Sequence, residues 1–316
     1  HDHDHDHHGA MSMPHIDPVD LGAGERLTVV ATTSIVGDVV ENIAGDAAEV
    51  TVLMARGQNP HAYEPTPRAM AAMNNAHIVF VNGLDLEEHL MEALEGMDAG
   101  YVVPVSAGIE PRDRGHGDDH DHGDDHDHGD HHHHADGDPH FWFAPTNVIV
   151  WAENIAEALS EADPRNHEGY EANADAYIAE LEAVDREIRA GVADIPRSRR
   201  KLVVDHAALG YFADEYGFEV IGAVIPSTTD QAEPSAQDIA ALVEVIREED
   251  VRAIFVGGTA GRGLRNLVDT VSEEVGVGLP VVELLTGSLA PEGSRGDTYL
   301  EFARYNGEAI VGALSR

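Results

Sequence analysis

The sequence predicts an α/β protein in which two Rossmann-like lobes, each built on a parallel sheet, are joined by one long helix. Short β-rich runs alternate with helical patterns from about residue 26, which is typical of strands that pair in parallel and are covered by helices on both faces. The same alternation restarts near residue 197, and a single long helical pattern separates the two halves. These three observations define the predicted architecture.

The first lobe is expected over residues 26–162. It begins with the run "LTVVATT" (27–33), which reads as a buried strand, and continues with a helix over 34–44 that Gly45 ends. Further strands are expected at 49–54, 78–81 and 101–105, and further helices at 67–75, 86–96 and 147–160.

The linking helix is expected within residues 163–196, because apolar residues recur there at helical spacing from Pro164 to about Ala193. Its apolar stripe consists of Tyr170, Ala174, Tyr177, Leu181, Val184 and Ile188. At about 1.5 Å per residue such a helix is some 40 Å long, which is too long for one small lobe. The second lobe then occupies residues 197–316, with strands at 201–205, 218–225, 251–256 and 280–284 and a last helix at 297–314.

Two tracts consist almost wholly of histidine, aspartate and glycine, "HDHDHDHHGA" (1–10) and "DHGDDHDHGDHHHH" (121–134). They lack the apolar side chains whose burial offsets the entropy of ordering a backbone, so residues 1–25 and the loop 111–139 are expected to be disordered. The first tract is native or a purification tag. Imidazole is a common metal ligand, so the second tract is expected to provide auxiliary weak metal sites. Their ligands would be His116, His120, His122, His126, His128, His131, His132, His133 and His134.

The charge excludes some partners. The chain has 59 acidic and 19 basic residues, a net charge of −40, and Lys201 is its single lysine. Such a surface repels nucleic acid and anionic membranes, and its lysine depletion is typical of a protein adapted to high salt.

Cysteine is absent, which excludes disulfides and thiolate metal sites. No run approaches the roughly 20 apolar residues of a membrane span, so any signal peptide or lipid anchor is expected upstream of residue 1.

Three isolated histidines follow predicted strands. His61 lies in "ARGQNPHAYEPTP" after the strand that ends at Met54, His140 closes the long loop after the strand that ends at Val105, and His206 follows "KLVVD". Ligands of open α/β sheets bind beyond the carboxyl ends of strands, so these histidines are expected to form a metal site in the cleft between the lobes. Three imidazoles suit zinc and leave a fourth position open.

These motifs resemble the zinc- and manganese-specific substrate-binding proteins of ABC importers. The segments "GQNPHAYEPTP", "DPHFWFAP" and "DHAALGYFADEYG" are similar to the ligand loops of that family, and "YLEFARYNGEAIVGAL" is similar to its C-terminal helix. The resemblance implies that His61, His140 and His206 are metal ligands. It also implies an extracytoplasmic, monomeric binding protein that delivers metal to the membrane permease of an importer, and the His/Asp-rich loop is similar to that of the zinc-specific members.

The sequence departs from the family pattern at two places. The family's acidic residue after the "IFV" strand is replaced by Gly257 and Gly258, and a ligand of the manganese-type members is also missing. Those members have an aspartate where this chain has Gly287, within "LLTGSLA". Manganese prefers carboxylate oxygen whereas imidazole suits zinc, so Zn²⁺ is expected in preference to Mn²⁺. The fourth ligand is left open among water, Glu64 and a carboxylate of the long loop.

Two other functions remain as alternatives. A zinc hydrolase would use the open coordination position to activate water, although the chain contains neither H-E-x-x-H nor G-x-S-x-G. A zinc buffer would bind metal chiefly through the two tracts. The glycine-rich "GGTAGRG" (257–263) lacks the lysine of a phosphate-binding loop and indicates a turn between a strand and a helix.

Overall fold

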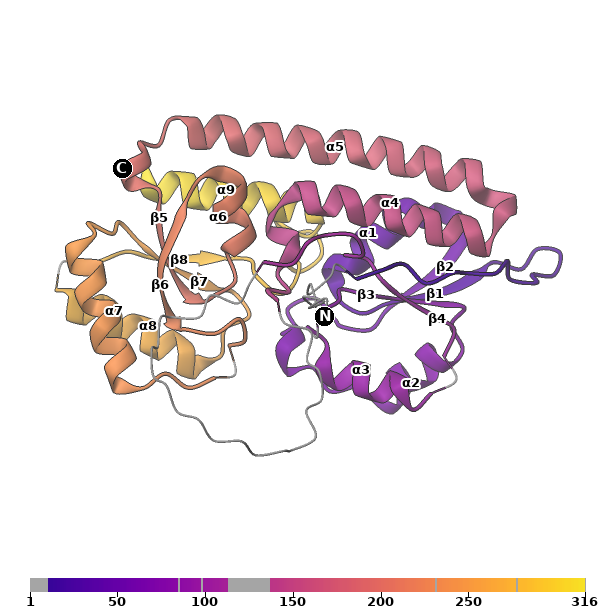
Figure 1. Cartoon of the computed structure of the whole chain (residues 1–316), viewed down its shortest axis with the longest axis horizontal. Coiled ribbons are helices and arrows are strands. Elements are labelled where there is room, and N and C mark those ends of the chain that lie inside the picture. The colour runs from indigo at the N-terminus through magenta and orange to yellow at the C-terminus, as the bar shows by residue number, and fades with distance from the viewer. Residues whose placement is uncertain are drawn as a thin grey trace, which may run out of the picture.

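Two four-stranded sheets lie side by side beneath three long helices in this computed structural model (Figure 1). It describes residues 11–84, 86–97, 99–112, 137–230, 232–276 and 278–315. The first lobe contains β1 (Leu27–Ala31), α1 (Ser34–Ala44), β2 (Ala48–Val52), α2 (Pro67–Asn74), β3 (Ile78–Val81), α3 (Glu88–Glu95), β4 (Tyr101–Pro104) and α4 (Pro145–Ala162). The second contains β5 (Lys201–His206), α6 (Gly210–Tyr216), β6 (Glu219–Ile225), α7 (Ala236–Glu248), β7 (Ile254–Gly257), α8 (Arg262–Val275), β8 (Val281–Leu284) and α9 (Tyr299–Leu314).

Both sheets have the same topology. The strand order is β2-β1-β3-β4 in the first lobe and β6-β5-β7-β8 in the second, and all neighbouring strands are parallel. The predicted fold class is therefore confirmed. In each sheet the first strand lies at an inner position, so the loops after β1 and β5 leave from the middle of the sheet.

The linking helix α5 (His167–Ala193) extends over both lobes (Figure 1). Its 27 residues make it about 40 Å long. All six residues of the predicted apolar stripe are buried. The helix is shorter than the expected segment 163–196, because Pro164 begins a separate 3₁₀ turn (Pro164–Asn166) and α5 starts only at His167.

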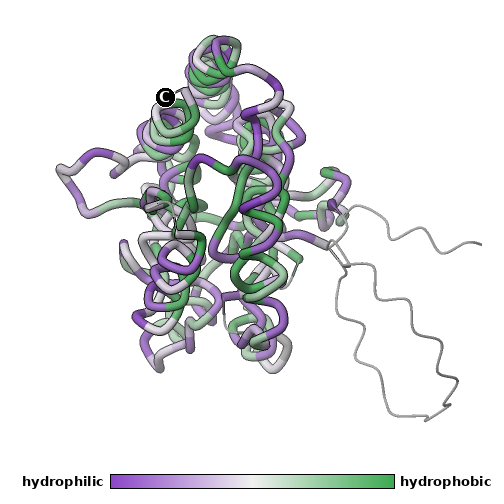
Figure 2. Tube along the Cα trace, turned by 90° about the vertical axis from the view of Figure 1, so that its left-hand side faces the viewer, coloured by the Kyte–Doolittle hydropathy of each residue, from purple (hydrophilic) through white to green (hydrophobic). Residues whose placement is uncertain are grey.

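One hydrophobic core is shared by the two lobes. Successive strand residues face opposite sides of a sheet, so Val29 and Val204 pack in this shared core whereas Val30 and Val203 pack on the far faces of their sheets. Residues of α1, α4, α5 and α9 complete the shared core, and Trp151 and Tyr299 are among its largest members. Hydrophobic and hydrophilic residues are interspersed along the whole trace (Figure 2). The lobes are thus packed together over a wide area.

The expected disorder of residues 1–25 is wrong for residues 11–25. Ile16 is 2% exposed, the Val19 N–H donates to the carbonyl of Ala162 at 2.8 Å, and the Met11 carbonyl accepts from Gly108 at 2.8 Å. The segment packs against the end of α4 because its few apolar residues find partners there. Residues 1–10 lie outside the described residues.

The loop 111–139 likewise divides into two parts. Residues 111–112 and 137–139 are described and packed against the lobes, contrary to the expected disorder, and Asp138 is buried. Residues 113–136, which include all nine histidines expected to form auxiliary metal sites, lie outside the described residues. Across the described part of the chain, no helix is long and apolar enough to cross a membrane.

Candidate metal centre

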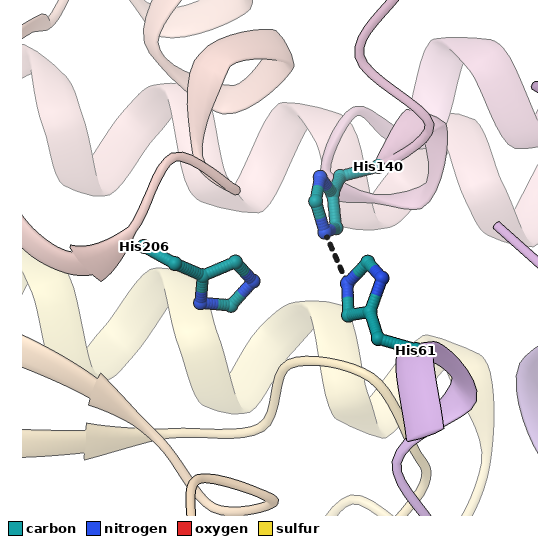
Figure 3. A group of neighbouring side chains, drawn as sticks. All are labelled: His61, His140 and His206. Atoms are coloured by element: carbon teal, nitrogen blue, oxygen red, sulfur yellow. Dashed lines mark hydrogen bonds between the residues drawn. The ribbon is translucent and has the colours of Figure 1, made fainter. Parts of the chain in front are cut away.

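The three isolated histidines meet between the lobes. One ring nitrogen of each of His61, His140 and His206 lies within 4.8 Å of the other two. The Nε2 atoms of His61 and His140 are 3.2 Å apart and point toward each other, with the ring of His206 beside them (Figure 3). His140 and His206 are only 1% and 5% exposed, whereas His61 is half-buried. The group is therefore accessible from the side of His61.

His61 is held by a short turn that its own neighbours dictate. Asn59 precedes a proline, which favours an extended backbone, and its side-chain oxygen accepts from the His61 N–H at 3.1 Å as the cap of the 3₁₀ turn Pro60–Ala62. The Asn59 side-chain amide also donates to Asp230 Oδ2 at 2.7 Å. Asp230 follows β6, so this bond links the His61 turn to the second lobe.

His140 is oriented by a carboxylate two residues before it. Asp138 Oδ1 accepts from the His140 backbone N–H at 3.0 Å and from its ring Nδ1 at 2.7 Å. The bond to Nδ1 fixes the tautomer that leaves Nε2 unprotonated and turned toward His61. The loop that carries His140 is also anchored to the first lobe, because the buried Asn82 side chain donates to the Pro139 carbonyl at 2.9 Å.

His206 is the last residue of β5 and pairs with the residue before it. Asp205 Oδ1 accepts from the His206 backbone N–H at 2.7 Å and from its ring Nδ1 at 2.9 Å. The other oxygen, Oδ2, accepts from the Gly257 N–H at 2.7 Å and thereby ties the pair to β7. His140 and His206 thus both present Nε2 with Nδ1 held by a buried carboxylate.

The two buried histidines differ in electrostatics. Burial lowers the pKa of His140, and the neighbouring Asp138 does not compensate fully. Burial also acts to lower the pKa of His206, but the hydrogen bond and charge of Asp205, with smaller contributions from Asp230 and Asp138, outweigh it and raise that pKa. The pKa of Asp205 is lowered, because the contacts to His206 and to Gly257 outweigh its burial. His140 is therefore neutral to a lower pH than His206.

Trp142 and the segment after β8 form the wall behind the histidines. The Trp142 indole N–H donates to the Thr286 carbonyl at 2.8 Å, and the Tyr299 hydroxyl donates to the Trp142 carbonyl at 2.8 Å. Gly287 lies against the His61 turn, where a Cβ would come within 2.7 Å of Pro60 Cδ. A side chain at this position would displace Pro60, so the glycine allows the two loops to approach closely.

The proposed fourth ligand Glu64, the one other sequence-predicted site residue within the described ranges, does not join the group. Glu64 is exposed and is not among the residues whose ligand atoms cluster with the three histidines. Three residues that sequence reasoning missed do contact the site or its turns, namely Asp138, Asp205 and Asp230. A usable signal existed for the first two, since "DPH" and "DH" place an aspartate just before a predicted ligand. Asp230 gave none, because it lies far from His61 in the sequence.

The geometry suits one tetrahedral metal ion. Two nitrogens bound to one ion at about 2.0–2.1 Å lie roughly 3.3 Å apart in a tetrahedral site, close to the spacing of the His61 and His140 Nε2 atoms. His206 would need only a small adjustment to become the third ligand. His61 is half-buried, so a fourth ligand such as water would approach the ion from its side.

A family model described as the periplasmic component A of zinc-uptake complexes (ZnuA) matches residues 29–313. The manganese-binding lipoprotein MntA of Halalkalibacterium halodurans is 34% identical over 295 residues, which cover 93% of this chain and 90% of that protein. The manganese ABC transporter substrate-binding lipoprotein PsaA of Streptococcus mitis is 30% identical over 304 residues, which cover 94% and 92% of the respective chains.

Solved structures of metal-binding proteins share the fold. The periplasmic zinc-binding protein TroA of Treponema pallidum has a TM-score of 0.77 at 28% identity and covers 92% of this chain and 100% of its own. An Mn-bound periplasmic metal-binding protein of Candidatus Liberibacter asiaticus has a TM-score of 0.77 at 25% identity, with 91% and 99% covered. The similarity thus extends over both lobes.

Proposed function

The chain belongs to the family of periplasmic metal-binding components of ABC importers, and from that premise we propose that it captures Zn²⁺ at His61, His140 and His206 and delivers it to a membrane permease. Like the relatives, it is a binding protein and not an enzyme. The observation that carries the proposal is the convergence of three imidazoles, two of them oriented by buried carboxylates. A neutral imidazole whose other nitrogen donates to a carboxylate is a typical zinc ligand.

The donor set supports zinc over manganese. Within the described ranges, no carboxylate joins the three histidine nitrogens in the cluster. Manganese favours oxygen ligands, and Gly287 supplies none. The relatives do not agree on the metal, because MntA and PsaA are named for manganese and TroA is named for zinc. A manganese cargo is therefore the competing assignment.

The fourth ligand proposed here is water. His61 is half-buried, so solvent reaches the metal from its side, and the exposed Glu64 stays outside the cluster. A water ligand keeps the cargo exchangeable, which a binding protein needs because it must release the ion to its permease. The site would then have the three protein ligands and one open position that are common for exchangeable zinc.

The site of action proposed is outside the cytoplasm. The family model is described as periplasmic, and the relatives MntA and PsaA are lipoproteins. We propose that this chain works in the same setting as a monomer, close to the membrane that holds its permease.

The His/Asp-rich segment is proposed to bind further zinc ions more weakly than the cleft. It contains the nine histidines named above, but its sequence has almost no apolar residues whose burial could hold those ligands in place before metal binds, and ordering ligands on binding lowers affinity. Zinc stoichiometry at saturation should therefore fall when residues 113–136 are replaced by a short linker, while one tight site persists. Equal stoichiometry in the two proteins would assign the segment a solvating role instead.

The decisive experiment is metal competition on the purified full-length chain. Isothermal titration with Zn²⁺ and with Mn²⁺, each against a chelator of known affinity, should give a tight zinc site and a much weaker manganese site. His206→Ala should weaken the tight site by orders of magnitude, whereas His89→Ala, which removes an exposed histidine of α3, should leave it unchanged. Tighter binding of Mn²⁺ than of Zn²⁺ would overturn the zinc assignment, and wild-type affinity in His206→Ala would overturn the site.

A further inference from the structure

The chain leaves and re-enters the first lobe at nearly one point. The Asp138 N–H donates to the Arg112 carbonyl at 2.8 Å, so the residues on either side of 113–136 are hydrogen-bonded to each other. Asp138 is buried at this junction. We call Arg112 and Asp138, whose backbones are bonded to each other here, the neck.

Tyr211 connects the neck to the second lobe. It lies on α6, shortly after His206, and is 6% exposed. Its hydroxyl donates to the Asp138 carbonyl at 2.6 Å and accepts from the Arg112 N–H at 3.1 Å. The Tyr211 hydroxyl thus bonds both residues of the neck, and both hydrogen bonds cross between the lobes.

Close approach of the neck to α6 depends on a glycine. A Cβ at Gly210 would lie 2.8 Å from Asp138 Oδ2 and would also collide with the Arg112 guanidinium. Gly210 is not in a left-handed conformation, so its use to the neck is the space it leaves and not its backbone freedom. The first turn of α6 thereby accommodates the side-chain ends of Arg112 and Asp138.

The Arg112 side chain extends this connection. Its guanidinium pairs with Asp214 of α6, with Nη2 at 3.3 Å from Oδ1, and its Nη1 lies 3.9 Å from Asp138 Oδ2. The other oxygen of Asp138 holds the ring of His140. A continuous chain of contacts therefore runs from α6 through Arg112 and Asp138 to the ring that presents Nε2 in the cleft.

We infer that Tyr211 and Arg112 are positioning residues for His140: they fix the Asp138–His140 pair against the lobe that carries His206, independently of residues 113–136. The inference rests on the proposed metal function of the three histidines. His140 and His206 belong to different lobes, so the distance between their Nε2 atoms depends on how those lobes are joined beside them. The bonds of Tyr211 to the neck join them within two residues of His140.

The test compares two tyrosines of the same helix. Tyr211→Phe removes both neck bonds with little change of shape, whereas Tyr216→Phe removes a hydroxyl that donates to Asp185 Oδ1 at 3.0 Å, away from the site. In the full-length protein, Tyr211→Phe should speed zinc dissociation about tenfold, the scale usual for loss of a group that orients a metal ligand. Tyr216→Phe should leave the rate within about twofold. The melting temperatures of the metal-free variants report any general loss of stability.

A second readout separates positioning from stability. The visible absorption of bound Co²⁺ depends on ligand geometry, so Tyr211→Phe should change the spectrum and Tyr216→Phe should not. Residues 113–136 can be replaced by a linker of about six residues, which is long enough because Arg112 and Asp138 are hydrogen-bonded to each other. This linker variant should keep the wild-type Co²⁺ spectrum and the wild-type zinc dissociation rate.

Three results would overturn the inference: a wild-type rate and spectrum in Tyr211→Phe, equal effects of the two tyrosine variants, or loss of the tight site in the linker variant. If His206→Ala, introduced alone into the protein, left the tight zinc site unchanged, the proposed function itself would be refuted. The two failures are therefore distinguishable.

Discussion

Asp205 and His206 are neighbours in the sequence whose side chains are hydrogen-bonded to each other, with Nδ1 2.9 Å from Oδ1. Neighbouring residues of a regular strand point to opposite faces of the sheet, so this pairing marks the point where β5 ends. The carboxylate is buried and holds three N–H groups, one of them from β7. A ligand on one lobe is thus oriented by the sheet that carries it.

Asp205→Asn should weaken zinc binding about 10–100-fold. The amide retains the shape of the side chain but loses the charge that makes the His206 ring a stronger ligand. Affinity is measured by chelator competition at pH 7.5. Asp269→Asn, which removes an exposed carboxylate from α8, is the matched control and should bind as wild type. Unchanged affinity in Asp205→Asn would contradict an orienting role.

Zinc affinity should fall as the pH falls, with His206 taking up a proton before His140 does. Its pKa is raised above the ordinary histidine value of about 6.5, whereas the pKa of His140 is lowered. A protonated imidazole cannot bind metal, so affinity is lost on going down through the His206 pKa. Asp205→Asn removes the charge that raises the pKa of His206, so that pKa should drop. The fall in zinc affinity should then begin at a lower pH than in the wild type. Apparent zinc affinities measured from pH 8 to pH 5 test this, and identical profiles would refute it.

Asp38→Asn should stabilise the protein at neutral pH. Asp38 of α1 is buried, and its carboxylate accepts from the N–H of Tyr299, the first residue of α9, at 2.9 Å. Burial raises the pKa of Asp38 from 3.8 to about 6, although that hydrogen bond opposes the shift. Because the folded state binds this proton more tightly, stability falls as pH rises from about 4 to 6, and the penalty persists above that window. A shift of this size corresponds to at most about 3 kcal/mol.

Urea unfolding at pH 7.5 and pH 4.5 measures the effect of Asp38→Asn. The variant should exceed wild type in free energy of unfolding at pH 7.5, and the difference should shrink at pH 4.5, where folded Asp38 is itself neutral. An equal loss of stability at both pH values would show that the carboxylate is required for packing and that its charge carries no penalty.

The melting temperature should rise from low salt to molar KCl. The chain carries 59 acidic and 19 basic residues, so repulsion among carboxylates opposes folding. Screening over a Debye length of about 3 Å at 1 M removes most of that repulsion. Calorimetry in KCl, with NaCl as a second salt and sucrose of equal osmolality as a non-ionic control, tests the expectation. A flat or falling melting temperature in both salts would remove the argument for adaptation to high salt.

The element order and the meeting of the three histidines could be predicted from the amino-acid sequence. Alternating β-rich and helical patterns depend on residues a few positions apart, and the apolar stripe from Tyr170 to Ile188 identified the long helix for the same reason. Parallel strands end at a common edge, so histidines placed after strands were expected to meet. Each of these inferences requires only local spacing and one general rule of sheet topology.

The surroundings of those histidines, in contrast, depend on long-range packing that the sequence pattern does not reveal. Glu64 is close to His61 in the sequence yet exposed, whereas Asp230 is distant in the sequence and is hydrogen-bonded to Asn59 beside the same histidine. Residues 11–25 follow a His/Asp-rich tract and were expected to share its disorder, but Ile16 is buried in the shared core. Contacts of this kind depend on how two lobes pack across one shared core, and no local pattern encodes the packing of segments more than a hundred residues apart.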